Sequence, residues 1–125
     1  MEVYRNRELI QIASVAYEII QKQSTLVKAN KKYANSMLDN YGVQKQTTIW
    51  IEELSELVKV ICKWQREYEK LEGDCSNDLL NDFITETADV ENVLEQIKLH
   101  FNIYKKVQTE RIIKNKRQLE RIANE

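Results

Sequence analysis

Apolar residues recur every three to four positions along most of the chain, which is the spacing expected for one face of an amphipathic α-helix. This pattern predicts a first helix over about residues 5–22, and Ser24 could cap a continuation to about residue 38. Whether these segments form one bent helix or two is left open by the pattern. The apolar positions of the first segment are Leu9, Ile10, Ala13, Ala16, Tyr17 and Ile20.

Two breaks that contain glycine divide the rest of the chain. Gly42 follows Asn40 and Tyr41 and can adopt a left-handed backbone conformation, which typically ends a helix. The second break contains Gly73 and two candidate N-caps, Asp74 and Ser76. These breaks and a short connection near residue 102 separate three more predicted helices, over about residues 43–70, 77–100 and 104–122.

The composition favours long helices, because the 125 residues include no proline and only 2 glycines. Short connections make consecutive helices antiparallel neighbours. We therefore expect an all-α fold, an antiparallel bundle of four to five helices, in a single domain over residues 1–125. Apolar surface on the first helix, at Trp64 and on the last helix is under-covered in one copy, so we expect oligomerisation to a homodimer or homotetramer to complete the bundle.

The charge balance, 19 basic against 20 acidic residues, gives no argument for binding to nucleic acid or to a membrane surface. The sequence shows no run of 18 apolar residues and no signal-peptide core, so we expect a cytoplasmic protein without a membrane partner. Two cysteines without a signal peptide do not suggest a disulfide framework.

Carboxylates lie beside the apolar stripes of the second and third predicted regions. In residues 43–70, Glu53 and Glu56 adjoin the stripe; in residues 77–100, Glu86 lies in its middle and Asp89 to one side. Residues three or four positions apart share a helix face, so two facing antiparallel helices would bring both sets together. A cluster of partly buried carboxylates repels itself unless a positive charge lies between its members.

A hard divalent cation with oxygen ligands fits such a cluster, and Mg²⁺ is the usual one, with Mn²⁺ as a substitute. This kind of site suits a phosphate-bearing substrate, whose charge the ion neutralises while a carboxylate acts as base. The alternative for each acidic residue is a solvated helix face. A di-iron bundle needs two Glu-x-x-His pairs, and the single histidine, His100, completes none. The same lack of histidine disfavours a His-rich zinc site.

Two motifs carry a resemblance to a known family. Ile51-Glu52-Glu53-Leu54-Ser55-Glu56-Leu57, followed by Glu86-Thr87-Ala88-Asp89-Val90, resembles the motifs of the MazG-like nucleoside triphosphate pyrophosphohydrolases, which belong to the all-α NTP pyrophosphatase superfamily. The resemblance covers about residues 41–100.

The resemblance implies a reaction in which water attacks the α-phosphorus of a (d)NTP and releases (d)NMP and pyrophosphate, with Mg²⁺ as cofactor and nucleotide-pool house-cleaning as one role. It also implies catalytic roles for Glu52 and Glu53, with Glu52 as a metal ligand or as the base that orients water. The metal ligands implied by the match are Glu53, Glu56, Glu86 and Asp89.

Four residues are candidates for substrate contacts. Lys63 and Arg66 resemble the basic residues that follow the first motif in the family, and the alternative for both is a solvated face. Asn92, three residues after Asp89, could hydrogen-bond the sugar or base, or be an ordinary polar flank residue. Trp50, one turn before Glu53, could stack on a base. The alternative for Trp50 is a core or interface anchor.

Two other functions remain open from the sequence. One is a nucleotide-binding sensor that holds a triphosphate without cleaving it, and the other is a structural helical oligomerisation module. The base and sugar preference is also open, and the candidates include dUTP, dCTP, other canonical nucleotides and modified nucleotides.

Overall fold

The computed structural model describes residues 2–125, with side chains from Arg5 onward, and over this range it contains four helices and no strand. This confirms the predicted all-α fold, with the lower of the two expected helix numbers. Within the described residues, none of the helices contains an apolar stretch long enough to cross a membrane. The helices are α1 (Glu2–Tyr41), α2 (Val43–Glu67), α3 (Asn77–His100) and α4 (Tyr104–Ala123).

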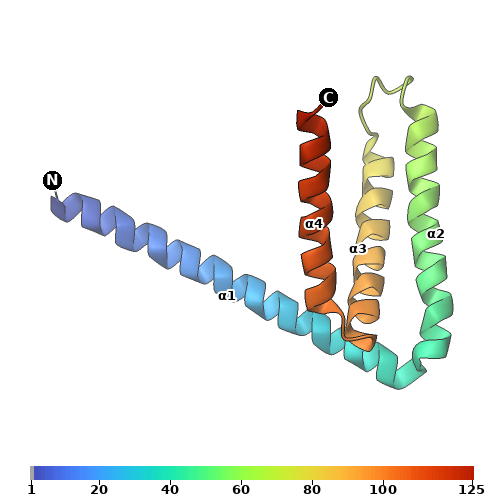
Figure 1. Cartoon of the computed structure of the whole chain (residues 1–125), viewed down its shortest axis with the longest axis horizontal. Helices are drawn as coiled ribbons and strands as arrows, with labels where there is room; N and C mark the ends of the chain where they lie inside the picture. Colours follow the sequence, from blue (N-terminus) through green and yellow to red (C-terminus); the bar gives the residue numbers. More distant parts are fainter. Residues whose placement is uncertain (1) are drawn as a thin grey trace.

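Figure 1 shows that α2, α3 and α4 run alternately up and down, so each contacts its sequence neighbour in an antiparallel arrangement. The position of the first helix differs from the prediction, which placed this helix within the antiparallel bundle. It crosses the lower end of the other three helices at a steep angle, contacts α3 and α2 through its C-terminal part, and projects away from them at its N-terminal part. The antiparallel bundle therefore consists of α2–α4, and α1 lies across it.

The first helix is continuous, which settles the question that the sequence left open. It runs through Ser24 without interruption, so Ser24 is not a cap, and the Thr25 hydroxyl donates to the Gln21 carbonyl at 3.0 Å within the same helix. No proline or glycine lies between Glu2 and Tyr41 to interrupt it. With 40 residues, α1 is about 60 Å long.

Gly42 alone connects α1 to α2. Its φ of 79° and ψ of 150° lie in a region that is essentially restricted to glycine, as its place in the sequence suggested. Its backbone N–H donates to the Leu38 carbonyl at 2.9 Å, and its carbonyl accepts from the backbone N–H of Gln46 at 3.1 Å. One residue can therefore end α1 and begin α2 at a sharp angle.

The connection from α2 to α3 begins earlier than expected, because α2 ends at Glu67 and not near residue 70. The residues that follow form turns, with Gly73 at a φ of 79°. Trp64 holds these turns against α2: its indole N–H donates to the Asp74 carbonyl at 3.1 Å, and its ring meets Tyr68 edge-on at 5.2 Å between centroids. The tryptophan thus anchors the loop.

The third helix begins where the sequence predicts. The Ser76 hydroxyl accepts a hydrogen bond from the Leu79 amide at 3.3 Å, which makes Ser76 the N-cap. Asp74, the other candidate, instead accepts from the amide of Cys75 at 2.8 Å. Both ends of α3 agree with the predicted range, 77–100.

The core between α2 and α3 contains a buried polar cluster as well as apolar side chains. The Gln96 side-chain oxygen accepts two hydrogen bonds, one from the side-chain amide of Gln46 at 3.0 Å and one from the Trp50 indole N–H at 2.7 Å. All three side chains are buried, and Trp50 is only 7% exposed. The other buried apolar side chains are Leu79, Val90 and Val93 of α3 and Ala34 of α1.

Candidate metal centre

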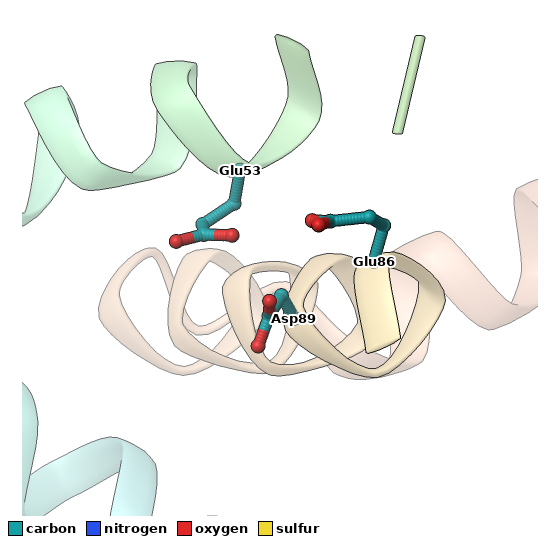
Figure 2. Close-up of side chains that lie close together, drawn as sticks. All are labelled: Glu53, Glu86 and Asp89. Carbon is teal, nitrogen blue, oxygen red and sulfur yellow. The ribbon is translucent and has the colours of Figure 1, made fainter. Parts of the chain in front are cut away.

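Three carboxylates converge between α2 and α3. Glu53 extends from α2 toward Glu86 and Asp89 on α3 (Figure 2), and one oxygen from each of the three lies within 4.8 Å of the others. All three residues are partly buried. The prediction was that Glu53, Glu56, Glu86 and Asp89 meet at one point, and the structure brings together three of these four residues.

The register of the two helices explains why these residues meet. Glu86 and Asp89 are three positions apart, so they share the face of α3 that turns toward α2. Gln46 lies seven residues before Glu53, and Gln96 lies seven residues after Asp89. Because the helices are antiparallel, the hydrogen bond between the two glutamines sets the same register that places Glu53 opposite Asp89.

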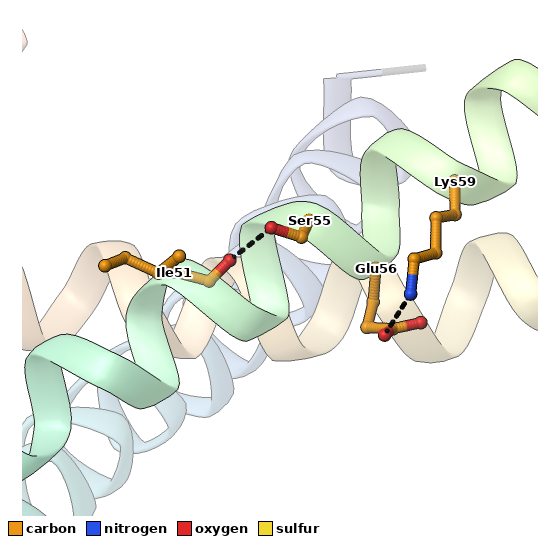
Figure 3. Close-up of polar contacts among 4 residues, drawn as sticks. All are labelled: Ile51, Ser55, Glu56 and Lys59. Carbon is orange, nitrogen blue, oxygen red and sulfur yellow. Dashed lines mark hydrogen bonds and ion pairs between the residues drawn. The ribbon is translucent and has the colours of Figure 1, made fainter.

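The other two acidic residues of the first motif are outside the three-carboxylate group. Glu56 occupies the register position opposite Glu86, but its oxygen accepts from the Lys59 ammonium at 3.0 Å on the same helix (Figure 3). Both side chains of this pair are largely exposed, and such a surface pair contributes about 1 kcal/mol or less. Glu52 is exposed on α2.

The environment raises the pKa of Glu53 above the ordinary value of 4.5. Desolvation is the largest cause, followed by repulsion from Asp89 and a hydrogen bond in which the protonated Glu53 donates to that carboxylate. Repulsion from Glu86 and from Glu52 adds to the effect. Glu53 therefore holds a proton more readily than an ordinary glutamate when no cation is bound.

The pKa of Glu86 is also raised above 4.5, first by desolvation and then by repulsion from Asp89. Glu56 and Asp82 repel it further, while the Lys59 ammonium partly offsets these effects. The carboxylate of Glu56 is thus close enough to act electrostatically on the group. A cation bound between these carboxylates would remove the repulsion that raises both pKa values.

These pKa shifts predict a pH dependence for the metal-free protein. Below the ordinary value of 4.5, Glu53 and Glu86 are protonated in both the folded and the unfolded chain. As the pH rises through the raised values, the unfolded chain releases these protons first, so the stability contributed by the two groups is lost. We expect the Glu53→Gln variant to become progressively more stable, relative to the wild type, between about pH 4 and about pH 7 in chelator.

Urea unfolding of both proteins across this range measures the difference in free energy of unfolding. Glu110→Gln, at an exposed position on α4, is the matched control and should show no such trend. A Glu53→Gln difference that is constant with pH would contradict the assigned repulsion.

A cavity of about 690 Å³ adjoins the carboxylates. Glu53 and Asp89 form part of its wall, so two of the three candidate ligands line the cavity. Its volume is in the range of sites for small molecules and cofactors. Residues from three helices complete the lining: Asn30, Tyr33, Ala34, Met37 and Tyr41 from α1, Lys45, Gln46 and Ile49 from α2, and Asn92, Val93, Glu95 and Gln96 from α3.

Several of these residues were not identified from the sequence. Lys45 lies eight residues before Glu53, with Ile49 between them, so helical spacing already placed all three on one face of α2. The contribution of α1, including Tyr33 and Tyr41, had no comparable signal, because it depends on where α1 crosses the other helices. Lys45 is thus a basic residue in the wall of the cavity that Glu53 and Asp89 also line.

A polar cluster links the helices beside the cavity. The Tyr104 hydroxyl of α4 donates a hydrogen bond to Glu95 of α3, and the Lys31 ammonium of α1 lies 4.7 Å from the centre of the Tyr104 ring. Desolvation, followed by the hydrogen bond and repulsion from Glu95, raises the pKa of Tyr104. The hydroxyl therefore keeps its proton and acts as a hydrogen-bond donor to Glu95 at the cavity wall.

The four predicted substrate contacts have different positions. Asn92 lines the cavity one turn from Asp89, and its contact with a ligand stays a prediction. Trp50 is buried, with its N–H bonded to Gln96, so its ring lies in the core and is not presented for stacking on a base. Lys63 and Arg66 are exposed on later turns of α2 and are not part of the cavity lining.

The donor set fits Mg²⁺. All three groups are carboxylates, the hard oxygen ligands that Mg²⁺ and Mn²⁺ accept, and the group includes no histidine or cysteine. An octahedral ion with bonds of about 2.0–2.1 Å has ligand oxygens roughly 3 to 4 Å apart. The separations of up to 4.8 Å are close enough for side-chain rotations to complete such a site.

Comparisons with protein-family models, with curated proteins and with solved structures found no match to this chain. The similarity to the MazG-like family therefore depends on the two acidic motifs and stays a prediction.

Proposed function

We propose that the protein is a Mg²⁺-dependent nucleoside triphosphate pyrophosphohydrolase with a MazG-like arrangement of helices. The observation that carries the proposal is the convergence of Glu53, Glu86 and Asp89 beside a cavity of about 690 Å³. A carboxylate group that faces a small-molecule cavity suits a substrate whose phosphates share a cation with the protein.

In this proposal Glu53, Glu86 and Asp89 hold the ion. Glu56 joins them by leaving Lys59, which costs little because that ion pair is exposed. Bound there, Mg²⁺ would neutralise phosphate charge and help to orient the water that attacks the α-phosphorus. The bond from the α-phosphorus to the bridging oxygen breaks, and the products are a nucleoside monophosphate and pyrophosphate.

The chain also supplies candidates for the base that accepts the proton of water. Glu52 is exposed next to Glu53 and lies outside the three-carboxylate group, which leaves it free to act. Glu53 is the alternative, because the resemblance of the first motif implies a catalytic role for it as well. Replacement of Glu53 should change the affinity for Mg²⁺ strongly, because Glu53 is also a proposed metal ligand. Replacement of Glu52 should not, if Glu52 acts only as the base.

The cavity supports binding of the nucleoside part. Tyr33, Met37 and Tyr41 offer aromatic and apolar surface to a base, and the amide of Asn92 can hydrogen-bond a base or sugar. Lys45 supplies a cation to the phosphates from within the cavity wall. Lys63 and Arg66 contribute only if a bound triphosphate extends along α2.

Self-association into a homodimer or homotetramer is part of the proposal, since much apolar surface of α1 and α4 is uncovered in one copy. The cytoplasmic location stays a prediction from the sequence.

The decisive experiment is a screen of canonical and deoxy nucleoside triphosphates for pyrophosphate release, with Mg²⁺ and with chelator. We expect Mg²⁺-dependent release of pyrophosphate with an equal amount of the monophosphate from at least one nucleotide. Orthophosphate as the product would contradict attack at the α-phosphorus. Nucleotide binding without any product would instead support the sensor, and neither binding nor turnover would support a structural helical module.

A further inference from the structure

The wall of the cavity contains a carboxylate that lies outside the three-carboxylate group. Glu95 of α3 lines the cavity together with Asp89 and Asn92, and these residues follow one another at three-residue intervals along the helix. Glu95 lies about 9 Å beyond Asp89 along the helix axis, and it is not a member of the group that could hold an ion. Binding of a metal ion therefore does not account for this charged group in the cavity wall.

The Glu95 carboxylate is held in place from another helix. Its Oε1 atom accepts the hydrogen bond of the Tyr104 hydroxyl, at the start of α4. The ammonium groups of Lys31 on α1 and Lys98 on α3 lie 4.7 Å and 5.3 Å from the centre of the Tyr104 ring, so two further helices contact this ring. The Glu95 side chain is only 18% exposed. A carboxylate fixed in this way loses little freedom when a ligand binds to it.

The second oxygen of this carboxylate can accept a hydrogen bond from a ligand. Its Oε2 atom lies 3.9 Å from the Lys98 ammonium, which is too far for a hydrogen bond. Desolvation is the largest cause that raises the pKa of Tyr104, so the tyrosine hydroxyl stays protonated and continues to donate to Oε1. Because an ionised carboxylate only accepts hydrogen bonds, Oε2 favours an N–H group of a ligand and repels a carbonyl oxygen.

We propose that Glu95 is a specificity-determining residue that selects nucleobases with an exocyclic amino group, such as cytosine and adenine, over bases with a carbonyl group in its place, such as uracil. The inference rests on the proposed nucleotide site, because an α-phosphate bound near Asp89 leaves the sugar and the base to occupy the cavity. Carboxylates of Asp and Glu accept from the cytosine amino group in protein–DNA contacts as well. Tyr104 is the positioning residue, since it holds Glu95 and is not part of the cavity wall.

Asn92 can complete the same recognition. It precedes Glu95 by three residues, so the two side chains are neighbours on α3. In cytosine and in adenine the amino group lies next to a ring nitrogen without a hydrogen. The amide of Asn92 can donate to this nitrogen while Glu95 accepts from the amino group. In uracil a carbonyl oxygen replaces the amino group, so the contact with Glu95 becomes repulsive.

The test measures nucleotide binding separately from cleavage. Isothermal titration calorimetry with Mg²⁺ compares α,β-methylene analogues, which cannot be cleaved at the α-phosphorus, of CTP with UTP and of ATP with ITP. The members of each pair differ chiefly by an amino group against a carbonyl oxygen. We expect the amino-bearing member of at least one pair to bind about 10- to 100-fold more tightly, which corresponds to one hydrogen bond to a charged group.

Three variants assign this preference to residues. Glu95→Gln keeps nearly the same shape but adds N–H donors, so it should lower the ratio of the two affinities about 10-fold or more. Tyr104→Phe removes only the hydroxyl and should lower the ratio in part, with no further effect in the Glu95→Gln background. A merely structural role of Tyr104 would instead weaken both members of a pair alike. Glu91→Gln, at an exposed position of α3 outside this cavity wall, is the control and should leave the ratio unchanged.

The outcomes separate this inference from the proposed reaction. Equal affinities within both pairs, tighter binding of the carbonyl-bearing members, no binding of any analogue, or an unchanged ratio in Glu95→Gln would overturn the inference. An effect of Glu95→Gln confined to the ratio of the CTP and dCTP analogues would also overturn it, because Glu95 would then contact the sugar. A preference that depends on Glu95, without release of pyrophosphate from any nucleotide, would support the inference and contradict the proposed reaction. Pyrophosphate release without the preference would do the opposite.

Discussion

Replacing Glu53 by glutamine, or Asp89 by asparagine, should abolish measurable pyrophosphate release while leaving the helical fold intact. Each change removes a charged oxygen ligand from a group whose members lie within 4.8 Å. Removal of one group that stabilises developing charge typically lowers kcat about 100- to 1000-fold. The loss of a direct metal ligand should be at least as large, and Mg²⁺ affinity measured by calorimetry should fall with it.

The same variants should be as stable as the wild type, or slightly more stable, in chelator. Repulsion from Asp89 raises the pKa of Glu53, so neutralising either residue relieves it. Added Mg²⁺ should raise the melting temperature of the wild type much more than that of either variant. Glu110→Gln serves as the control for charge removal. Full turnover by Glu53→Gln or Asp89→Asn would exclude these carboxylates as metal ligands.

Changes at Glu56 and Glu52 separate their roles from that of Glu53. Glu56→Gln should weaken Mg²⁺ binding less than Glu53→Gln, because Glu56 begins in an ion pair with Lys59 outside the group. Glu52→Gln should lower kcat with little change in Mg²⁺ affinity if Glu52 is the base. Equal losses of metal affinity in all three variants would instead make Glu52 a ligand.

Replacing Gln96 by leucine should be strongly destabilising. The Gln96 oxygen accepts from the buried Gln46 amide and from the Trp50 indole N–H. Leucine leaves both donors without a partner, and each buried unsatisfied group costs about 1–3 kcal/mol. The expected loss of roughly 2–6 kcal/mol is a large part of the 5–15 kcal/mol typical of a whole domain. The melting temperature should fall by about 10–20 °C.

Two matched variants make this prediction specific. Gln46→Leu removes one donor and leaves the bond from Trp50 to Gln96, so it should cost less than Gln96→Leu. Gln65→Leu, at an exposed position on α2, should change stability by about 0.5 kcal/mol or less. Urea unfolding followed by tryptophan fluorescence measures all three. If Gln96→Leu costs no more than Gln46→Leu, the shared acceptor does not have the assigned role.

The Gln96 variant also connects stability to the site. Gln46 and Gln96 pair in the same register as Glu53 and Asp89, two turns before Glu53 on α2 and two turns after Asp89 on α3. Loosening this pair should let α2 and α3 shift, which separates the carboxylates. We therefore expect Gln96→Leu to weaken Mg²⁺ binding at temperatures where the protein remains folded, whereas Gln65→Leu should not.

Features that depend on local sequence were predictable. Ser76 caps α3 through its own hydroxyl, and Gly42 adopts a backbone conformation that other residues avoid, so neither needs distant contacts. The shared face of Glu86 and Asp89 follows from their spacing along one helix. The same reasoning could have identified Lys45, which helical spacing places on the face of Glu53. Local rules therefore determined the helices and the faces that present the acidic residues.

Features that depend on contacts between distant residues were decided only by the tertiary structure. Trp50 is buried because its N–H meets Gln96, 46 residues later, and α1 lines the cavity because it crosses α2 and α3 at their ends. The distance of Lys63 from the cavity follows from the same crossing. The sequence alone determined that acidic residues lie close together on one face of each of two helices. The antiparallel register determined that Glu53, Glu86 and Asp89 meet, because a helix face acquires neighbours only when the chain packs.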